Sequence, residues 1–172
     1  MRDGASIKPA PDEPEVLTYV TYPTSAMTGN SSQSCVASAS TEYSSSFPTY
    51  YAFDNTRTNA WAAKTSDSAP WIQLKVPQAL KNISVKVYSW SSSNQYKGEP
   101  VSGTLMGSTN GSTWTQIGSY SGWASDDKGF VGEIVCTNET AYNYVRLNIR
   151  SYTSGKGYVS IGYMTVTGGV PT

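Results

Sequence analysis

Hydrophobic residues along this chain recur with the two-residue period of β-strands, in short runs separated by Gly, Pro, Asn and Ser. The run from Trp71 to Val76 illustrates the pattern, because its apolar members alternate with Gln73 and Lys75. The apolar members are Ile72, Leu74 and Val76. Side chains two residues apart lie on one face of a strand, so we expect this apolar face to line a core. No window shows the period of an amphipathic helix.

The pattern predicts a series of short strands, which is typical of a β-sandwich or barrel. Their expected ranges are 16–22, 34–38, 71–76, 83–88, 103–108, 114–120, 129–137, 144–150 and 159–166. The dipeptide Asn110-Gly111 can take positive φ and predicts a hairpin turn between two of them. We therefore predict an all-β protein with an antiparallel β-sandwich as its architecture.

The N-terminal segment differs in composition from the rest of the chain. Residues 1–16 hold Pro9, Pro11 and Pro14 among charged residues, which favours an extended arm over a packed element. The remaining residues, 17–172, are enough for one domain with its own core and too few for two ordinary domains. The predicted organisation is an extended Pro-rich arm followed by one β-sandwich domain.

Charge and hydropathy exclude two classes of partner. The chain has 12 basic and 12 acidic residues, so it lacks the basic surface that follows nucleic acid phosphates. No apolar stretch approaches transmembrane length, so we expect no membrane insertion. The 13 Tyr and 5 Trp residues lie among many Ser, Thr and Asn residues. This composition suits a β surface that recognises polar ligands, and equally the preference of Tyr and Thr for strands.

The chain contains no histidine, which removes the usual general base and the commonest metal ligand. The few acidic residues mostly occupy turn-like contexts, so we expect no catalysis. Cys35 and Cys136 are the only cysteines. Two thiols without histidine cannot form a zinc site, which leaves a disulfide or two buried thiols as alternatives.

Five segments carry motifs in a fixed order between Tyr50 and Gly168. They are Tyr51–Trp61, Pro70–Val76, Gly107–Trp114, Tyr142–Leu147 and Tyr158–Val166. Together they resemble the discoidin family, also called factor five/eight type C domains, and the related family-32 carbohydrate-binding modules. The resemblance implies a galactose-binding-like jelly roll that binds carbohydrate without catalysis.

In such a fold, function is carried by loops at one end of the sandwich. Antiparallel alternation places the loops 62–70, 89–99 and 151–158 at a common end. The candidate ligand-binding residues in these loops are Lys64, Trp90, Asn94, Gln95, Tyr96, Tyr152 and Lys156. Aromatic faces can stack on a sugar ring while amide and cationic donors bind its hydroxyl groups.

The sequence does not decide which sugar is bound or which residues bind it. Galactose-binding relatives often use a His and an Arg in these loops, whereas this chain has no His and has Trp90 near the usual position of the Arg. The alternative for Trp90 and Tyr96 is that they only fold their long loop. Arg57 and Trp123 are further candidates if the binding surface lies elsewhere.

The resemblance also implies a calcium site in the loop that begins at Asp54. The candidate ligands are Asp54, Thr56 and Asn59, but Gly162-Tyr163 stands where the family has an Ala-Glu pair. Calcium prefers several oxygen ligands and usually more than one carboxylate, so the missing Glu weakens this site. The alternative is that Asp54 forms an Asx turn within its own loop.

We expect a non-catalytic carbohydrate-binding module that mediates attachment to cell-surface glycans, at a virion surface or otherwise outside a cell. The N-terminus lacks the apolar region of a signal peptide. A Pro-rich arm joined to a sugar-binding domain suits a bacteriophage virion protein, with the arm contacting other virion proteins. The alternatives are a structural virion decoration protein that makes only protein contacts, and an accessory module of a secreted glycoside hydrolase.

Overall fold

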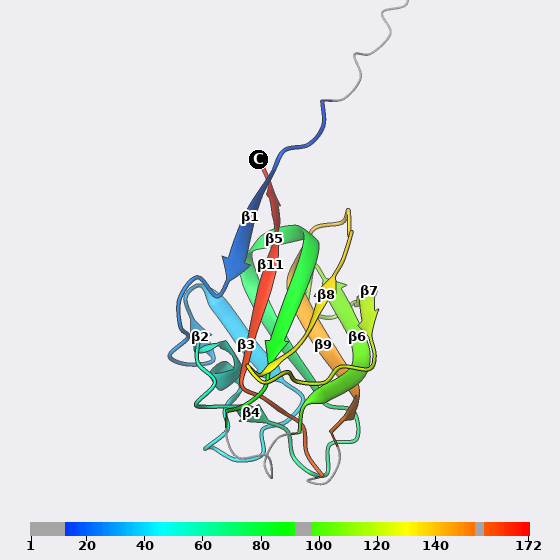
Figure 1. Cartoon of the computed structure of the whole chain (residues 1–172). Helices are drawn as coiled ribbons and strands as arrows, with labels where there is room; N and C mark the ends of the chain where they lie inside the picture. Colours follow the sequence, from blue (N-terminus) through cyan, green and yellow to red (C-terminus); the bar gives the residue numbers. More distant parts are fainter. Residues whose placement is uncertain (1–12, 92–97, 154–156) are drawn as a thin grey trace, which may run out of the picture.

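The computed structural model describes residues 13–91, 98–153 and 157–172 and consists of antiparallel strands in two layers (Figure 1). The strands are β1 (Leu17–Tyr22), β2 (Ser31–Ser32), β3 (Cys35–Ala39), β4 (Trp61–Ala62), β5 (Trp71–Tyr88), β6 (Pro100–Ser108), β7 (Thr115–Tyr120), β8 (Phe130–Val135), β9 (Tyr142–Tyr152), β10 (Ser160–Ile161) and β11 (Tyr163–Pro171). A 3-10 helix, η1 (Thr49–Phe53), lies between β3 and β4. The prediction of an all-β antiparallel sandwich is confirmed.

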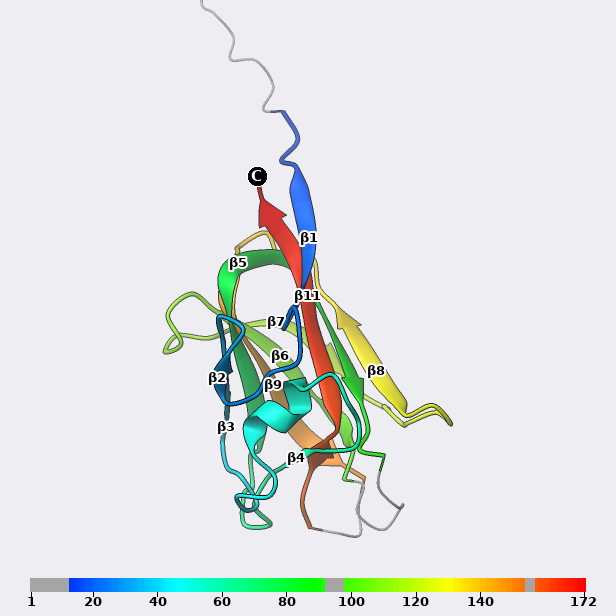
Figure 2. The ribbon, with the colours of Figure 1, turned by 90° about the vertical axis from the view of Figure 1, so that its left-hand side faces the viewer.

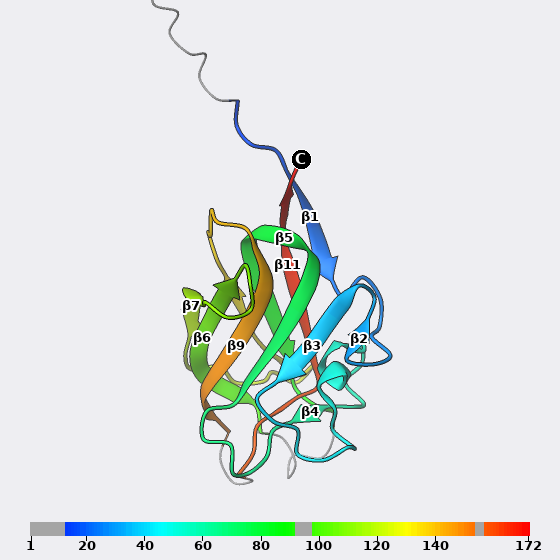
Figure 3. The same ribbon diagram turned by 180° about the vertical axis from the view of Figure 1, so that it is seen from behind.

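Strand β5 belongs to both layers. Its first half pairs with β3 and β9, and β9 continues through β6 to β7; we call this layer the first sheet. Its second half pairs with β11 and β8, and β11 pairs with β1; we call this layer the second sheet. Figure 1 looks onto the second sheet and Figure 3 onto the first. The short strands β4 and β10 form a separate pair.

The continuity of β5 differs from the sequence-based prediction of two strands at 71–76 and 83–88. The chain bends between the sheets without leaving strand geometry, and the pairing with β9 shifts register between Lys75 and Leu80. Asn82 takes a positive φ of 47° at the end of the bend, and its N–H donates to the Asn138 carbonyl. Leu80 is fully buried within the bend, which anchors it to the core.

The core lies between the two sheets and is built by alternation. The buried residues Ile72, Leu74 and Val76 come from the first half of β5, as predicted. Val85 and Val87 supply the opposite wall from its second half. The adjacent strand β9 adds a third row: Val145, Leu147 and Ile149. Alternate residues of these strands therefore face outward, where they are available for recognition.

The other predicted strands are present within a few residues of their expected bounds, and the two-residue strands β2 and β4 were not predicted. The expected strand 159–166 is divided into β10 and β11 at Gly162, where a side chain would lie 2.6 Å from the Ser89 carbonyl oxygen. Helix η1 was not expected, because its five residues are too few to show a period. Within the described residues, no helix is long and apolar enough to cross a membrane.

The predicted arm lies mostly outside the described residues, so its extended conformation stays a prediction. Its last residues are exposed and lead into β1. Glu15 forms an ion pair with Lys81 (2.6 Å), and the Val16 carbonyl accepts a hydrogen bond from the Thr172 N–H. Leu17 pairs with Pro171, so the start of β1 and the end of β11 lie side by side at one end of the sandwich (Figures 1 and 2).

Candidate functional site

The opposite end of the sandwich gathers most of the loops, and we call it the loop end (Figure 2). The described loops there span residues 40–48, 54–60, 63–70, 89–91, 121–129 and 157–159. They meet because β5 starts and finishes at this end, as do the finish of β9 and the start of β6. The described parts of the loops that carry Lys64 and Trp90 therefore lie at one end of the sandwich, whereas Tyr152 belongs to strand β9.

An aromatic row crosses the loop end. Tyr158 lies 5.4 Å from Tyr43, Tyr43 lies 5.9 Å from Phe47, and Phe47 lies 5.5 Å from Trp90, measured between ring centroids. The last two contacts are edge-to-face, the geometry that aromatic pairs prefer. We call these four residues the aromatic row. It joins loops that are more than 100 residues apart in sequence.

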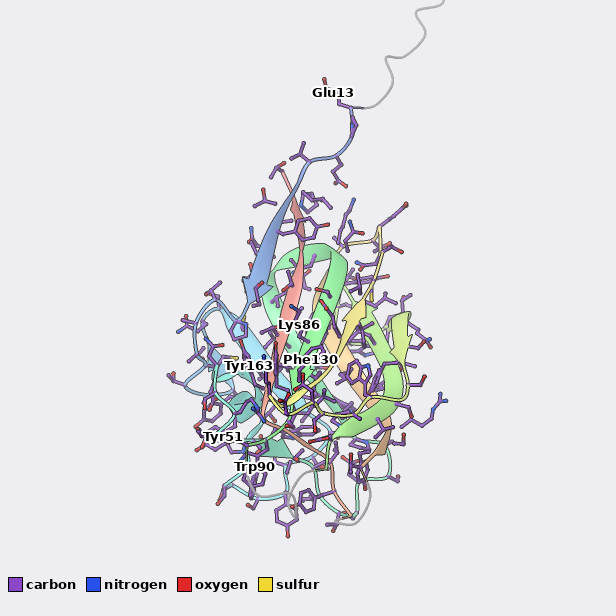
Figure 4. All side chains as sticks on the ribbon, in the orientation of Figure 1. Glu13, Tyr51, Lys86, Trp90, Phe130 and Tyr163 are labelled. Carbon is purple, nitrogen blue, oxygen red and sulfur yellow. The ribbon has the colours of Figure 1, made fainter. Side chains whose placement is uncertain are left out.

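Trp90 is half-buried at one end of this row (Figure 4). Its indole Nε1 donates to the Thr58 carbonyl oxygen at 3.2 Å. The contact with Phe47 and this hydrogen bond orient the ring. A half-buried ring with a fixed orientation keeps part of its surface accessible to a ligand.

Arg57 fastens the loop that carries Trp90. Its Nε donates to the Ser89 carbonyl oxygen (2.7 Å) and its Nη2 to the Ser89 hydroxyl (3.1 Å). The Arg57 carbonyl accepts hydrogen bonds from both the N–H and the hydroxyl of Ser91. Arg57 was a further candidate for ligand contact, and in the structure its guanidinium donates to the carbonyl oxygens of Ser89 and Lys128, which belong to two other loops.

A polar hollow of about 460 Å³ lies beside the aromatic row. Its lining includes Asn30, Thr41, Glu42, Thr49 and Lys64. The carboxylate of Glu42 accepts hydrogen bonds from the Thr49 N–H (2.7 Å) and hydroxyl (2.8 Å). The segment 41–49 thus contributes to both the hollow and the row. The exposed Lys64 side chain is the predicted site residue that lines the hollow.

Asp67 fixes the loop that carries Lys64. Its Oδ2 accepts hydrogen bonds from the hydroxyls of Ser40 (2.5 Å) and Thr41 (2.7 Å), and its Oδ1 accepts one from the Ala69 N–H. Burial alone would raise the pKa of Asp67, but these hydrogen bonds together bring it below its ordinary value. The carboxylate is therefore charged at neutral pH and holds the wall of the hollow in place.

The remaining predicted site residues have different outcomes. Tyr152 ends β9 opposite Pro100 and packs partly against the core, and no described contact joins it to Lys64 or Trp90. Four predicted residues lie outside the described part of the chain: Asn94, Gln95, Tyr96 and Lys156. Trp123, the other further candidate, stacks on Tyr120 with centroids 4.1 Å apart.

The Asp54 loop forms the Asx turn that was the alternative to calcium binding. Asp54 Oδ1 accepts a hydrogen bond from the Thr56 N–H (3.1 Å), and Oδ2 accepts one from the Asn59 side-chain amide (2.9 Å). The Thr56 hydroxyl is bonded to that of Thr58. No group of three or more acidic, Cys or His residues gathers within the described residues. One carboxylate engaged on both oxygens does not fit a calcium ion.

The two cysteines are buried as free thiols in different sheets, which resolves the alternatives left open by the sequence. Cys35 belongs to β3 and Cys136 follows β8. Burial raises the pKa of the Cys35 thiol to about 11 and also raises that of Cys136. Both thiols act as small apolar core residues.

A feature of the first sheet escaped the sequence reasoning. The guanidinium of Arg146 stacks between Trp71 and Trp114, with Cζ 3.8 Å and 3.9 Å from the two ring centroids. The Nε of Arg146 donates a hydrogen bond to the Gln73 side-chain oxygen at 2.9 Å. The three stacked residues are too far apart in sequence for any local pattern to show the contact.

Solved structures with the same architecture are carbohydrate-binding modules. A family-32 module of a Clostridium perfringens family-89 glycoside hydrolase, solved with GalNAc-β-1,3-galactose, superposes with a TM-score of 0.66 at 18% identity, covering 77% of this chain and 94% of that one. The family-32 module of C. perfringens NanJ, solved with galactose, gives 0.63 at 18% identity over 77% and 93%. A chitosan-binding module from Paenibacillus sp. IK-5 gives 0.62 at 24% identity over 77% and 93%.

The fold is therefore that of the carbohydrate-binding modules of glycoside hydrolases. The F5/8 type C domain family matches residues 36–163, and the chain belongs to this family. No curated protein sequence matches the chain significantly. The family resemblance predicted from the five sequence motifs is confirmed.

Proposed function

We propose that this protein is a non-catalytic carbohydrate-binding module whose loop end attaches to cell-surface glycans. The observation that carries the proposal is the aromatic row beside the polar hollow. A sugar ring has an apolar face that stacks on aromatic rings and a rim of hydroxyl groups that needs hydrogen-bond partners. Trp90 offers an aromatic ring for the apolar face of the sugar. The hydroxyl, amide and charged groups around Lys64 offer hydrogen-bond partners for its hydroxyl groups.

The size and the chemistry of the loop end support this function. A hollow of about 460 Å³ falls within the range of small-ligand sites. The chain has no histidine, the commonest general base of enzymes. Neighbours of the same fold bind galactose or GalNAc-β-1,3-galactose, which supports a glycan as the ligand.

A glycan array and a whole-cell binding assay of the full chain test the proposal, each run with calcium and with a chelator. We expect binding that survives chelation. Trp90→Ala should abolish the binding of neutral glycans without unfolding the domain, whereas Lys86→Gln, on the exposed face of the second sheet, should retain it. No binding to any glycan or cell would contradict the function, and intact binding by Trp90→Ala would contradict the site.

The biological setting is a separate part of the proposal. A bacteriophage virion protein, docked on other virion proteins through residues 1–16, stays a prediction from the sequence. An accessory module of a glycoside hydrolase is supported by neighbours that come from such enzymes. Genes for virion proteins or for a catalytic domain beside this one would distinguish the two settings.

A further inference from the structure

The stacked Arg146 has the properties of a prepared anion receptor. Trp71 and Trp114 cover both faces of its guanidinium plane at van der Waals distance. Nε is directed to Gln73, and the Gln73 amide in turn donates to the Ser38 hydroxyl at 3.1 Å. Stacking and this hydrogen-bonded pair fix both the position and the rotation of the guanidinium. A ligand therefore meets donors that need no reorganisation.

The outer edge of the Arg146 guanidinium carries N–H donors that a ligand can use. Within the described part of the chain, the terminal nitrogens Nη1 and Nη2 of Arg146 make no hydrogen bond and no ion pair. The side chain is only half-buried, and although burial lowers its pKa, an arginine stays charged at any ordinary pH. These two nitrogens form the planar fork that binds a carboxylate through two parallel hydrogen bonds.

The surrounding face is cationic. The side chains of the first half of β5 and of β9 that point away from the core are Trp71, Gln73, Lys75, Tyr144, Arg146, Asn148 and Arg150. From β6, the outward residues Thr104, Met106 and Ser108 complete the face. Lys75, Arg146 and Arg150 are cations, and no described residue in this set is acidic. We call this surface the sheet face, and Figure 3 looks onto its strands.

A hollow of about 340 Å³ adjoins the receptor. Trp71, Thr104, Asn148 and Arg150 are among its lining residues. Asn148 pairs with Trp71 on one side and with Thr104 on the other, so the hollow lies between Arg146 and Arg150 along β9. Those two arginines are four residues apart on one face, or roughly 13 Å at the ordinary rise of a strand. An indole, an amide, a hydroxyl and the Arg150 cation thus border this space, and the Trp71 ring that lines it also carries the Arg146 guanidinium.

A second hollow extends the surface. It measures about 370 Å³ and shares Gly103, Thr104 and Arg150 with the first. Its remaining lining is polar and comes mostly from β7 and the residue that follows it: Ser102, Gln116, Ser119, Tyr120 and Ser121. Gly103 has no room for a side chain, because an added methyl group would collide with the Asn148 carbonyl oxygen. The two hollows form one elongated depression, mainly apolar beside Trp71 and polar beside β7, a shape that suits a chain ligand.

We propose that the sheet face is a second binding surface, specific for polysaccharides that carry carboxylates, with Arg146 as the receptor of one uronate group. The hollow beside Trp71 takes a sugar ring, and Arg150 meets a further carboxylate along the chain. Because both faces of the Arg146 guanidinium are covered, an anion can approach only in its plane. A carboxylate fits this approach through two parallel hydrogen bonds to Nη1 and Nη2.

This surface is independent of the proposed function, since Trp90 and Lys64 belong to the loop end and not to the sheet face. A structural role of Arg146, stiffening the first sheet through its stack, is the competing explanation. The two explanations differ in what they require of the terminal nitrogens of Arg146. Stiffening needs only the stack and Nε, whereas a receptor also needs Nη1 and Nη2 to stay available.

Calorimetric titration of the full chain with tetragalacturonate tests the proposal, with the carboxyl-reduced tetrasaccharide as the matched neutral probe. We expect binding of the acidic probe that weakens as salt rises from roughly 50 to 200 mM, because exposed charges are screened. The neutral probe should bind the sheet face at least about 10-fold more weakly, since it lacks the charge-assisted pair with Arg146.

Gln73→Glu is the decisive variant. It keeps the hydrogen bond to Arg146 and the indole stack but places a carboxylate beside the guanidinium. The negative charge of this carboxylate offsets the positive charge that Arg146 would otherwise present to the ligand. We expect at least about a 10-fold loss of tetragalacturonate affinity with an unchanged urea midpoint. Arg146→Lys, which retains the charge but loses the planar fork, should show a similar loss.

Two controls complete the experiment. Lys86→Gln removes a cation from the second sheet, on the opposite side of the sandwich (Figure 4), and should bind tetragalacturonate like the wild type. Trp90→Ala should also bind it normally, which separates this surface from the loop end. The proposal is overturned if the wild type does not bind the acidic probe, if Gln73→Glu binds it equally well, or if Lys86→Gln loses as much affinity as Gln73→Glu.

Discussion

Arg57 lies so close to Gly129 that a methyl group on the glycine would collide with the guanidinium. Gly129 also takes a φ of +83°, a conformation that side chains rarely adopt. It follows Lys128 in the 121–129 loop and donates its N–H to the Asp126 carbonyl, while its own carbonyl accepts from the Ser89 N–H. Three loops of the loop end are thus joined at one residue without a side chain.

We predict that Gly129→Ala lowers the free energy of unfolding by about 2 to 3 kcal/mol, because it adds a collision with Arg57 to the strain of positive φ. Gly122→Ala is the matched control, since Gly122 has a φ of +67° and no atom within 4 Å of an added methyl group. It should cost only about 1 kcal/mol. Urea denaturation measures both, and equal losses would show that the Arg57 contact has no energetic role.

Calcium should have no effect on the stability of this protein. Asp54 supplies the one carboxylate of its loop and engages both oxygens with Thr56 and Asn59. The unfolding midpoint should therefore be the same with millimolar calcium and with a chelator. Asp54→Ala should lower the free energy of unfolding by about 1 to 2 kcal/mol in both solutions. A calcium-dependent rise that Asp54→Ala removes would restore the metal site.

The Asn110 side chain should stabilise the hairpin between β6 and β7. Its Oδ1 accepts hydrogen bonds from the N–H groups of Ser112 and Thr113, both at 2.8 Å. Asn110→Ala leaves these donors without that partner, and we expect a loss of about 1 to 2 kcal/mol by chemical denaturation. Asn110→Asp keeps the acceptor and should lose less than half as much. Equal losses would show that the acceptor is not what stabilises the turn.

Alkaline pH should destabilise the fold in part through Cys35. Burial raises the pKa of its thiol from 9.0 to about 11. Between these values the unfolded chain ionises while the folded chain keeps its proton, so stability falls as pH rises through this window. The free energy of unfolding, measured at several pH values from 8 to 11, should fall less steeply in Cys35→Ala than in the wild type. Parallel curves would contradict the assignment.

Most of the fold could be predicted from local patterns in the sequence. Alternation placed Ile72 and Leu74 in the core, and the Asn110-Gly111 dipeptide marked the turn, where Gly111 indeed takes a φ of +75°. The sequence predicted two strands in place of the continuous β5, because residues 77–82 combine a proline with polar residues. This pattern indicates a loop between strands. The chain turns there between two sheets without losing its strand geometry.

The candidate site was predictable only as a set of loops. Strand alternation indicated that the loops of Lys64 and Trp90 share one end of the sandwich, and the fold agrees. The packing of Trp90 on Phe47 joins positions with no common local pattern. The stack of Arg146 with two tryptophans likewise joins residues that share no local pattern. Tertiary contacts of this kind depend on the register of distant strands, which a single sequence does not encode locally.

The antiparallel pairing of Leu17 with Pro171 places the two ends of the domain opposite the loop end, and this arrangement has a mechanical consequence. If the loop end holds a glycan, a pull between that glycan and the N-terminal segment runs along the strands. The hydrogen bonds between strands lie perpendicular to this direction, so the load shears many of them together instead of opening them one at a time. A module of this design would resist detachment under flow.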